Sequence, residues 1–252
     1  MTNKQEKMIC NSFGISKLKA FQKDVITDLL KGKDVLGLAR TSEGKSICFL
    51  SMITLHPNGL LIGILPTVSL MRDLVQRCED NKIRAGCLYS ENRENTNTIE
   101  QLTHRKLQAL FVAPERLSDP RLWKAIQKNS VHTVVVDEVH CLTEWGNEFR
   151  PMYRNIGKFI KDLPNSPVVA AFSATVMPDD IPYIVKSLHM KNPVIHIGKL
   201  KRSNLSLKKS FVKNDAARYA KVRKAIQKYD SKGKIVIYCT RVCDVEDMRD
   251  FL

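Results

Sequence analysis

The sequence predicts an α/β fold in which a mostly parallel sheet is covered by helices. Short apolar runs alternate along the chain with stretches of helical periodicity. Most of these runs are continuous rather than alternating, which is typical of strands buried on both faces of a parallel sheet. The run 34–39 is followed directly by a polar segment that contains glycine, and the run 133–136 is followed directly by an acidic one. Ligands of such sheets bind at the carboxyl ends of the strands, so both segments are candidate functional sites.

Seven apolar runs are the predicted strands: 34–39, 60–65, 109–112, 133–136, 168–172, 194–197 and 235–239. Helices are predicted through Val25 to Leu30, over 47–53, and from Pro66-Thr67 onward. A later helix carries a stripe of Tyr219, Val222, Ile226 and Tyr229, which predicts a core-facing side. Lysines and arginines are concentrated from Lys199 to Lys209, which is typical of a solvated linker, although the run can also touch nucleic acid. We therefore predict a boundary between a first domain over 1–198 and a second domain over 199–252.

The composition favours a polyanionic partner. Lys plus Arg is 41 and Asp plus Glu is 26, giving a formal charge of +15. Nucleic acid is a better match than an acidic membrane surface, while a merely soluble basic protein is the alternative. No signal core or membrane-spanning run is present, so no membrane partner is expected. The seven scattered cysteines include no Cys-x-x-Cys pair, which predicts free thiols in an intracellular, reducing compartment and no zinc site.

The segment 39–46, Ala-Arg-Thr-Ser-Glu-Gly-Lys-Ser, lies between a predicted strand and a predicted helix. A tight loop ending in Gly-Lys-Ser in this context is typical of a phosphate-binding loop. Lys45 would reach the terminal phosphates and the Ser46 hydroxyl would bind Mg²⁺. Because Ala39 stands where the strict pattern has glycine, a surface turn with a solvated lysine is the alternative.

Two adjacent carboxylates, Asp137 and Glu138, directly follow the run Thr133–Val136. Such a pair is costly after a buried strand unless a cation or another partner is present. In a nucleotide hydrolase, Asp137 would bind Mg²⁺ through water and Glu138 would orient and deprotonate the attacking water. The alternative is an acidic pair that interacts with a helix dipole.

Several further polar residues have both a functional and a structural interpretation. The carboxamide of Gln22 can pair with an adenine edge, or it can be an ordinary exposed helix glutamine. Thr67 and Ser69, at a predicted helix start, can hold a nucleic-acid phosphate or cap the helix. Arg116, after the next strand, has the same two interpretations.

An aromatic segment follows the acidic pair. Trp145 and Phe149 can stack on bases, or they can be core anchors, and Arg150 can contact a phosphate or an aromatic ring. Ser173 and Thr175 lie at the end of the predicted strand 168–172. Their two hydroxyls are suited to coupling the binding of a nucleotide to the binding of a nucleic acid.

Taken together, these motifs resemble those of the RecQ family of DNA helicases, within the DEAH/DEAD-type superfamily. The matching segments are, in order, 13–14 with 18–22, 41–46, 69–73, 112–117, 137–140, 145–151 and 173–175, and 202–205 with 237–239 resemble the start of a second domain. The Trp-Gly-x-x-Phe-Arg-Pro loop directly behind Asp-Glu-x-His is specific to this family.

The resemblance implies a RecA-like P-loop NTPase domain that binds ATP and Mg²⁺. It also implies coupling of hydrolysis to 3′-to-5′ movement on DNA in repair and recombination, with single strands and duplex junctions as partners. The location would be the nucleus in a eukaryote or the cytoplasm in a bacterium. The implied nucleotide-binding residues are Lys19, Gln22, Thr41, Ser42, Glu43, Gly44, Lys45 and Ser46. The implied catalytic residues are Lys45, Asp137, Glu138 and His140, with His140 linking the acidic pair to 173–175.

The sequence also departs from the family pattern. Ser42 and Glu43 stand where the family has glycines, and a glutamate beside phosphate oxygens is electrostatically unfavourable. Glu144 and Asn147 replace a glutamine and a histidine in the aromatic loop. The resemblance further implies that the second domain, which supplies an arginine finger worth about 10³–10⁵ in rate, is incomplete. The alternative function is therefore a truncated or divergent relative that binds ATP and DNA with little or no turnover.

Overall fold

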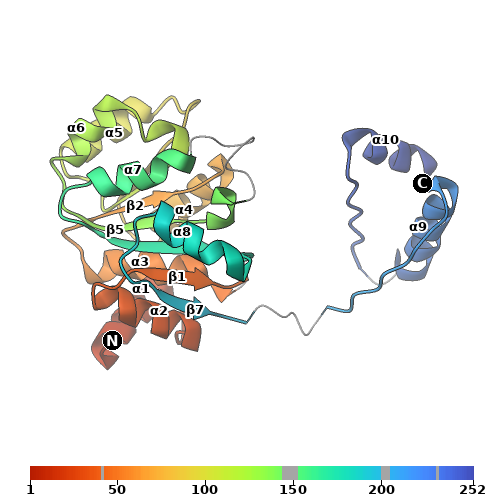
Figure 1. Ribbon diagram of the computed structural model, residues 1–252, viewed down its shortest axis with the longest axis horizontal. Helices are drawn as coiled ribbons and strands as arrows, with labels where there is room; N and C mark the ends of the chain where they lie inside the picture. Colours follow the sequence, from red (N-terminus) through yellow and green to blue (C-terminus); the bar gives the residue numbers. More distant parts are fainter. Residues whose placement is uncertain (41–42, 144–152, 200–204, 231–232) are drawn as a thin grey trace. The chain divides into compact units, whose positions relative to one another are not determined.

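The computed structural model describes residues 1–40, 43–143, 153–199, 205–230 and 233–252. Its contacts divide the chain into two compact units, Met1–Lys201 and Arg202–Leu252. The first unit is built on a seven-stranded sheet with helices on both faces (Figure 1). The α/β class predicted from the sequence is therefore confirmed.

All seven strands of the sheet run parallel, in the order β3-β4-β2-β5-β6-β1-β7. Their bounds are β1 Val35–Leu38, β2 Leu60–Ile64, β3 Ala85–Leu88, β4 Ala109–Val112, β5 Val131–Val136, β6 Val168–Ser173 and β7 Val194–Ile197. Each apolar run predicted between residues 34 and 197 forms a strand. The edge strand β3 was not predicted, because Ala-Gly-Cys-Leu carries little β propensity and is only partly buried.

The helices form two layers, one on each face of the sheet (Figure 1). Their bounds are α1 Asn3–Phe13, α2 Ala20–Leu30, α3 Lys45–Leu55, α4 Val68–Asp80, α5 Asn95–Thr103, α6 Pro120–Ile126, α7 Arg154–Asp162 and α8 Ile181–Ser187. One apolar cluster joins α1 to α4 with strand residues such as Val35, and the other joins α5 to α8 with residues such as Leu36. Successive strand side chains point to opposite faces, so a continuous apolar run serves both layers.

The buried carboxylate of Asp34 ties three segments together just before β1. Its Oδ1 accepts a hydrogen bond of 2.8 Å from the backbone N–H of Val169 in β6, and its Oδ2 accepts one from the N–H of Lys191. Its backbone carbonyl also accepts a hydrogen bond of 2.8 Å from the N–H of Val194, where β7 begins. Asp34 therefore fixes the start of β1 relative to both neighbouring strands, to β6 through its side chain and to β7 through its backbone carbonyl.

Asp34→Ala is expected to lower the free energy of unfolding by about 2–4 kcal/mol, because donors that the carboxylate satisfies lose their acceptor. Asp34→Asn keeps one acceptor oxygen and should lose about half as much. Urea unfolding of both variants provides the measurement. Equal stability of Asp34→Ala and the wild type would show that the carboxylate does not hold these strands together.

The second unit contains the helices α9 (Asp215–Tyr229) and α10 (Val242–Phe251). The predicted strand 235–239 is wrong, because this segment forms no strand in the structure. None of its side chains is buried: Ile237 and Cys239 are half-buried, and Val236 and Tyr238 are 69% and 92% exposed. A strand needs a hydrogen-bonded neighbour, and the described part of this unit contains no other strand.

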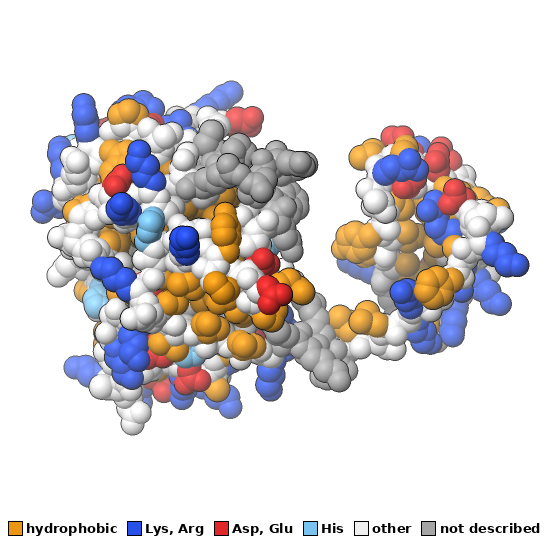
Figure 2. Space-filling model, viewed as in Figure 1, with side chains coloured by type: hydrophobic (Ala, Val, Ile, Leu, Met, Phe, Trp, Pro, Cys, Tyr) orange, Lys and Arg blue, Asp and Glu red, His pale blue; other side chains and the backbone are white. Residues whose placement is uncertain are grey.

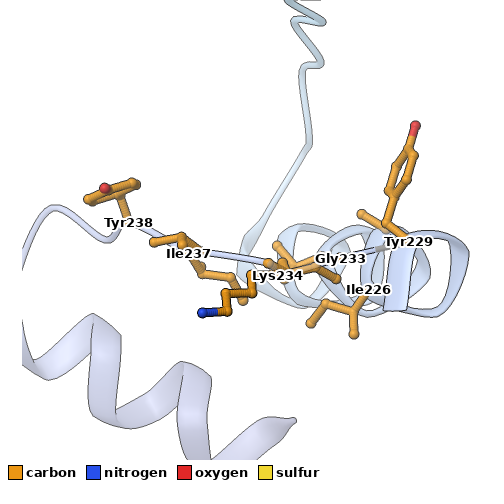
Figure 3. A pocket seen from close by; sticks show the side chains of 10 residues that line it. Ile226, Tyr229, Gly233, Lys234, Ile237 and Tyr238 are labelled. Carbon is orange, nitrogen blue, oxygen red and sulfur yellow. The ribbon is translucent and has the colours of Figure 1, made fainter. Parts of the chain in front are cut away.

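The predicted core-facing stripe of α9 is also not buried. Tyr219, Val222 and Ile226 are only half-buried and Tyr229 is exposed. A cavity of about 590 Å³ lies between α9 and residues 233–238. Figure 3 shows Ile226 and Tyr229 on the helix beside this extended segment. Without a sheet in the described part of this unit, the apolar stripe of α9 has little to pack against.

Lys and Arg side chains are spread over the face of the first unit that Figure 2 shows. Apolar side chains gather where α8 and β7 lie, and Tyr183, Ile195 and Ile197 are exposed there. Among the described residues, no helix combines the length and apolar character needed to cross a bilayer.

Candidate functional site

The candidate site lies at the carboxyl ends of three neighbouring strands. In the sheet, β6 lies between β5 and β1. The Gly-Lys-Ser loop follows β1, Asp137 follows β5, and Ser173 is the last residue of β6. Neighbouring strands are about 4.8 Å apart, so side chains at these three ends can reach one another. The topology therefore brings together segments that are 92 residues apart in the sequence, from Lys45 to Asp137.

Lys45 is the buried cation of this site. It is the first residue of α3 and only 6% exposed. Among the described residues its ammonium nitrogen makes no hydrogen bond, and its ion-pair neighbour is Glu138 Oε1 at 3.9 Å. A buried ammonium with its N–H groups unused is costly unless a ligand supplies acceptors. The amino end of α3 adds positive partial charge at the same place.

Gln22 anchors the loop that carries Lys45. Its side-chain nitrogen donates to the backbone carbonyls of Glu43 and Gly44 at 3.3 and 3.2 Å, and its oxygen accepts from the N–H of Lys19 at 2.8 Å. The side chain is only 4% exposed. The alternative interpretation, an ordinary exposed helix glutamine, is therefore wrong, because the carboxamide is buried and bonded to the backbone at both ends. Gln22 joins the start of α2 to the loop, and its pairing with adenine stays a prediction.

Gly44 is required at this position for two reasons. Its φ is +73°, and a Cβ there would lie 2.6 Å from Gln22 Nε2. Gly44→Ala should therefore destabilise the chain by about 1–3 kcal/mol through backbone strain and loss of the Gln22 anchor. Gly14→Ala is the matched control, since Gly14 has a φ of +61° but no atom within 4 Å of its Cβ position. Thermal unfolding should show the larger loss for Gly44→Ala, and equal losses would mean that the contact with Gln22 is unimportant.

Glu43 is neutralised by cations within the chain. Arg40 Nε and Nη2 both lie 2.9 Å from Glu43 Oε1, and Lys19 Nζ lies 3.5 Å from Oε2. Burial acts to raise the pKa of Glu43, but the hydrogen bond from Arg40 and the charge of Lys19 outweigh it, so the pKa is lowered. The unfavourable charge expected from the sequence is thus balanced by Arg40. The signal for this pair was present in the sequence, because Arg40 stands three residues before Glu43.

Asp137 is held in a partly desolvated position. Its backbone N–H donates to the carbonyl of Ile64 in β2 at 3.1 Å, and its Oδ1 accepts a hydrogen bond of 2.9 Å from the N–H of Glu138. Burial raises the pKa of Asp137 to about 6, with Lys45 acting to lower it and Glu138 to raise it. A carboxylate in this state gains from a nearby cation.

Glu138, His140, Ser173 and Thr175 form a connected chain between the ends of β5 and β6. The imidazole Nδ1 of His140 lies 3.2 Å from Glu138 Oε2 and 2.9 Å from Ser173 Oγ. Ser173 Oγ in turn donates to the carbonyl of Thr175 at 3.0 Å and accepts from its N–H at 3.2 Å. Glu138 has a φ of 51°, a left-handed conformation that starts the 3₁₀ turn Val139–Leu142. The contact that the resemblance implied between His140 and the 173–175 segment is present in the structure.

Ser46 has a partner that the sequence did not indicate. Its hydroxyl accepts a hydrogen bond of 2.7 Å from Arg77 Nη1, which comes from the last turn of α4. The two residues are 31 positions apart, and no local pattern connects them. A cation therefore lies beside the hydroxyl predicted to bind Mg²⁺.

The residues predicted to contact DNA are only partly described. Thr67 and Ser69 are exposed at the start of α4, where Thr67 is the N-cap and accepts from the N–H of Leu70 at 3.4 Å. Arg116 is half-buried and paired with Asp119, so its charge is balanced within the chain. Trp145, Phe149 and Arg150 lie outside the described residues, as do Thr41 and Ser42 of the predicted nucleotide site.

These features define a RecA-like α/β domain with a candidate site at the carboxyl ends of β1, β5 and β6. The family model for DEAD/DEAH box helicases matches residues 19–181, a range that contains every described residue of the candidate site. The chain belongs to the DEAD/DEAH box helicase family, and the RecQ resemblance of its motifs is confirmed by its curated relatives.

Two of these relatives are bacterial. A probable ATP-dependent DNA helicase RecS of Bacillus subtilis is 30% identical over 239 residues, which covers 94% of this chain and 47% of that protein. An ATP-dependent DNA helicase RecQ of Pasteurella multocida is 33% identical over 198 residues, covering 77% of this chain and 30% of the relative. The chain thus spans half the length of such relatives or less.

Solved structures show the same fold. A hypothetical ATP-dependent RNA helicase from Sulfolobus tokodaii matches with a TM-score of 0.63 at 20% identity, covering 100% of this chain and 72% of the other. A DUF1998 helicase MrfA bound to DNA matches with a TM-score of 0.62 at 16% identity, covering 79% of this chain and 30% of the other.

Proposed function

We propose that this chain is the nucleotide-binding part of a RecQ-type ATP-dependent DNA helicase. The observation that carries the proposal is the Lys45 ammonium, which is buried, makes no hydrogen bond among the described residues, and lies 3.9 Å from Glu138. The phosphates of a nucleoside triphosphate would supply the acceptors that this ammonium lacks. The oxygen donors of Ser46 and Asp137 are of the kind that Mg²⁺ prefers. The residues therefore fit ATP with Mg²⁺.

In this proposal each residue has a defined role. Lys45 binds the terminal phosphates, while Ser46 and Asp137 hold Mg²⁺, the latter through water. The metal would supply positive charge to the phosphates when bound. Glu138 would orient the attacking water and accept its proton. A cavity of about 650 Å³ beside Lys19, a size typical of small-molecule sites, would accept the base and ribose.

DNA binding would be coupled to ATP hydrolysis through the contacts of His140. The 144–152 segment, which carries Trp145, directly follows the turn that contains His140, and His140 contacts Ser173. A base stacked on Trp145 would thus lie a few residues from the water-orienting Glu138. We propose 3′-to-5′ movement on single strands and duplex junctions, with a role in repair and recombination. A first RecA-like domain over 1–198 and the start of a second over 199–252 are part of the same proposal.

One observation favours a second function, in which the chain binds ATP and DNA with little turnover. The Ser46 hydroxyl, proposed as a metal ligand, is already hydrogen-bonded to Arg77. A site that binds its metal weakly would bind nucleotide without hydrolysing it efficiently, since the metal neutralises charge that develops on the phosphates. DNA-stimulated hydrolysis discriminates between the two functions.

Lys45→Ala is expected to weaken binding of a fluorescent ATP analogue by at least about 100-fold, because the buried ammonium is the main phosphate contact of the site. Lys124→Ala, an exposed lysine on α6, is the control and should bind like the wild type. Anisotropy titration measures both variants, and circular dichroism checks that they are folded. Unchanged binding by Lys45→Ala would place the nucleotide elsewhere and end the proposal.

The DNA part of the proposal has its own test. Single-stranded DNA should bind with an affinity that falls steeply as salt increases, as expected for a basic protein that releases counterions. Trp145→Ala should weaken this binding by about 1–3 kcal/mol if the ring stacks on a base. If Trp145 is instead a core anchor, the same variant should lose thermal stability and keep the salt dependence of the wild type.

A further inference from the structure

Arg77 is an arginine whose charge is not balanced by an acidic partner among the described residues. It is half-buried near the end of α4, and its side chain donates a hydrogen bond of 2.7 Å to Ser46 Oγ. Other half-buried cations of this unit are paired: Arg40 with Glu43, and Arg116 with Asp119. No carboxylate oxygen in the described ranges lies within ion-pair distance of the Arg77 guanidinium. Its charge is therefore available to an anion.

The position of this charge connects it to the candidate site. Ser46 follows Lys45 in the first turn of α3, so the guanidinium lies beside the residue whose ammonium is buried without a hydrogen bond. A guanidinium has five N–H groups, and the hydrogen bond to Ser46 uses one of them. The planar arrangement of the remaining donors suits phosphate oxygens.

The same contact interferes with a metal at Ser46. A serine hydroxyl binds Mg²⁺ through a lone pair of its oxygen, and Arg77 donates its hydrogen bond to that oxygen. A divalent cation placed at the same hydroxyl would also lie close to the guanidinium, and like charges at that separation repel strongly in a partly buried site. Mg²⁺ and Arg77 therefore compete for Ser46.

We propose that Arg77 sets the metal requirement of this site, its guanidinium taking the place at the Ser46 hydroxyl that Mg²⁺ would otherwise occupy. This inference rests on the proposed function, because it concerns the same nucleotide. ATP then binds without a divalent cation, since Arg77 and Lys45 both supply positive charge to its phosphates. Mg²⁺ reaches Ser46 only when the guanidinium leaves the hydroxyl. Arg77 is thus a specificity-determining residue that acts on the choice of cation.

The experiment compares nucleotide affinity with and without metal. A fluorescent ATP analogue is titrated into the wild type and Arg77→Gln, once in EDTA and once in millimolar MgCl₂. The glutamine amide can still donate to Ser46 but carries no charge. Arg72→Gln is the matched control, because Arg72 also lies on α4 but bonds the hydroxyl of Tyr89 at 3.0 and 2.7 Å. Thermal unfolding confirms that each variant is folded.

The wild type and Arg72→Gln should bind the analogue in EDTA within about threefold of their affinity in MgCl₂. Arg77→Gln should bind about tenfold more weakly in EDTA, the scale of one hydrogen bond to a charged group, and MgCl₂ should restore it. If the wild type needs Mg²⁺ as strongly as Arg77→Gln does, the inference about Arg77 is overturned while nucleotide binding stands. If the wild type binds no nucleotide under either condition, the proposed function fails as well.

Discussion

Gly157→Ala is expected to lower the free energy of unfolding by about 3 kcal/mol or more, because a fixed backbone group already fills the place of the new methyl group. Gly157 is buried in α7, and a Cβ there would lie 2.0 Å from the carbonyl oxygen of Ser187 at the end of α8. A backbone carbonyl cannot rotate away as a flexible side chain does. The two helices would have to separate by more than about 1 Å. Protein interiors are packed as densely as organic crystals, so this separation would disrupt the side-chain packing between α7 and α8.

Differential scanning calorimetry measures this effect. For a unit of this size, a loss of about 3 kcal/mol corresponds to a fall in melting temperature of roughly 6–12 °C. Lys158→Ala is the control, because Lys158 is next to Gly157 in the same helix and its side chain is exposed. This substitution should change the free energy of unfolding by less than about 0.5 kcal/mol. A Gly157→Ala protein that melts with the control would show that α7 and α8 do not make this close contact.

The consequence extends to the candidate site. The helix α7 begins soon after the 144–152 segment, and α8 follows the turn that contains Thr175. Ile156 and Phe159 of α7 belong to the same apolar cluster as Ile184 of α8. The close approach at Gly157 therefore fixes α7 against α8, the two helices that follow in sequence the segments through which DNA binding would be coupled to the nucleotide.

The sequence predicted those parts of the site that are formed by residues close together in the chain. The Gly-Lys-Ser loop requires a strand before it and a helix after it, and both are present as β1 and α3. The valine run that precedes Asp137 can be buried on both faces only in the middle of a parallel sheet, which places its end beside the loop. The predicted site residues themselves remain predictions about chemistry, which the proposed experiments address.

Contacts between distant segments could not be predicted in the same way. The Arg77–Ser46 hydrogen bond joins two helices that the sequence treats as unrelated. The sequence left the Gln22 carboxamide as either an adenine-pairing group or an exposed helix glutamine, and it did not predict the hydrogen bonds to the loop backbone. The 235–239 run has the composition of a buried strand, yet strand formation depends on neighbours that the described part of its unit does not contain.

Asp137→Asn is expected to stabilise the metal-free chain at pH 7.5 and, in an Arg77→Gln background, to remove the metal dependence of nucleotide binding. Burial raises the pKa of Asp137 to about 6 in the folded chain, against an ordinary value of 3.8 for an aspartate. Because the folded pKa is the higher one, the stability linked to the protonated carboxyl is fully present below about pH 4 and is lost as pH rises through 6. At pH 7.5 the ionised carboxylate costs up to about 3 kcal/mol, since one pKa unit is 1.36 kcal/mol.

The neutral amide of asparagine avoids this cost, and its oxygen can still accept the hydrogen bond from the N–H of Glu138. The gain in unfolding free energy of Asp137→Asn over the wild type should thus be largest at pH 7.5 and shrink toward pH 4.5. Asp73→Asn, an exposed substitution on α4, is the control and should change stability little at either pH. Urea unfolding at the two pH values gives the four differences that are needed.

The same substitution that raises stability should impair the response of nucleotide binding to metal. An asparagine cannot supply the negative charge that would hold Mg²⁺ through water, so added metal should strengthen nucleotide binding to Arg77→Gln but not to Arg77→Gln/Asp137→Asn. A substitution that raises stability but removes this response to metal would identify Asp137 as a residue retained for its charge at a cost in stability. A gain that is equal at pH 4.5 and pH 7.5 would instead show that the Asp137 carboxyl is not strained by burial, and the argument for a cation beside it would lose its electrostatic basis.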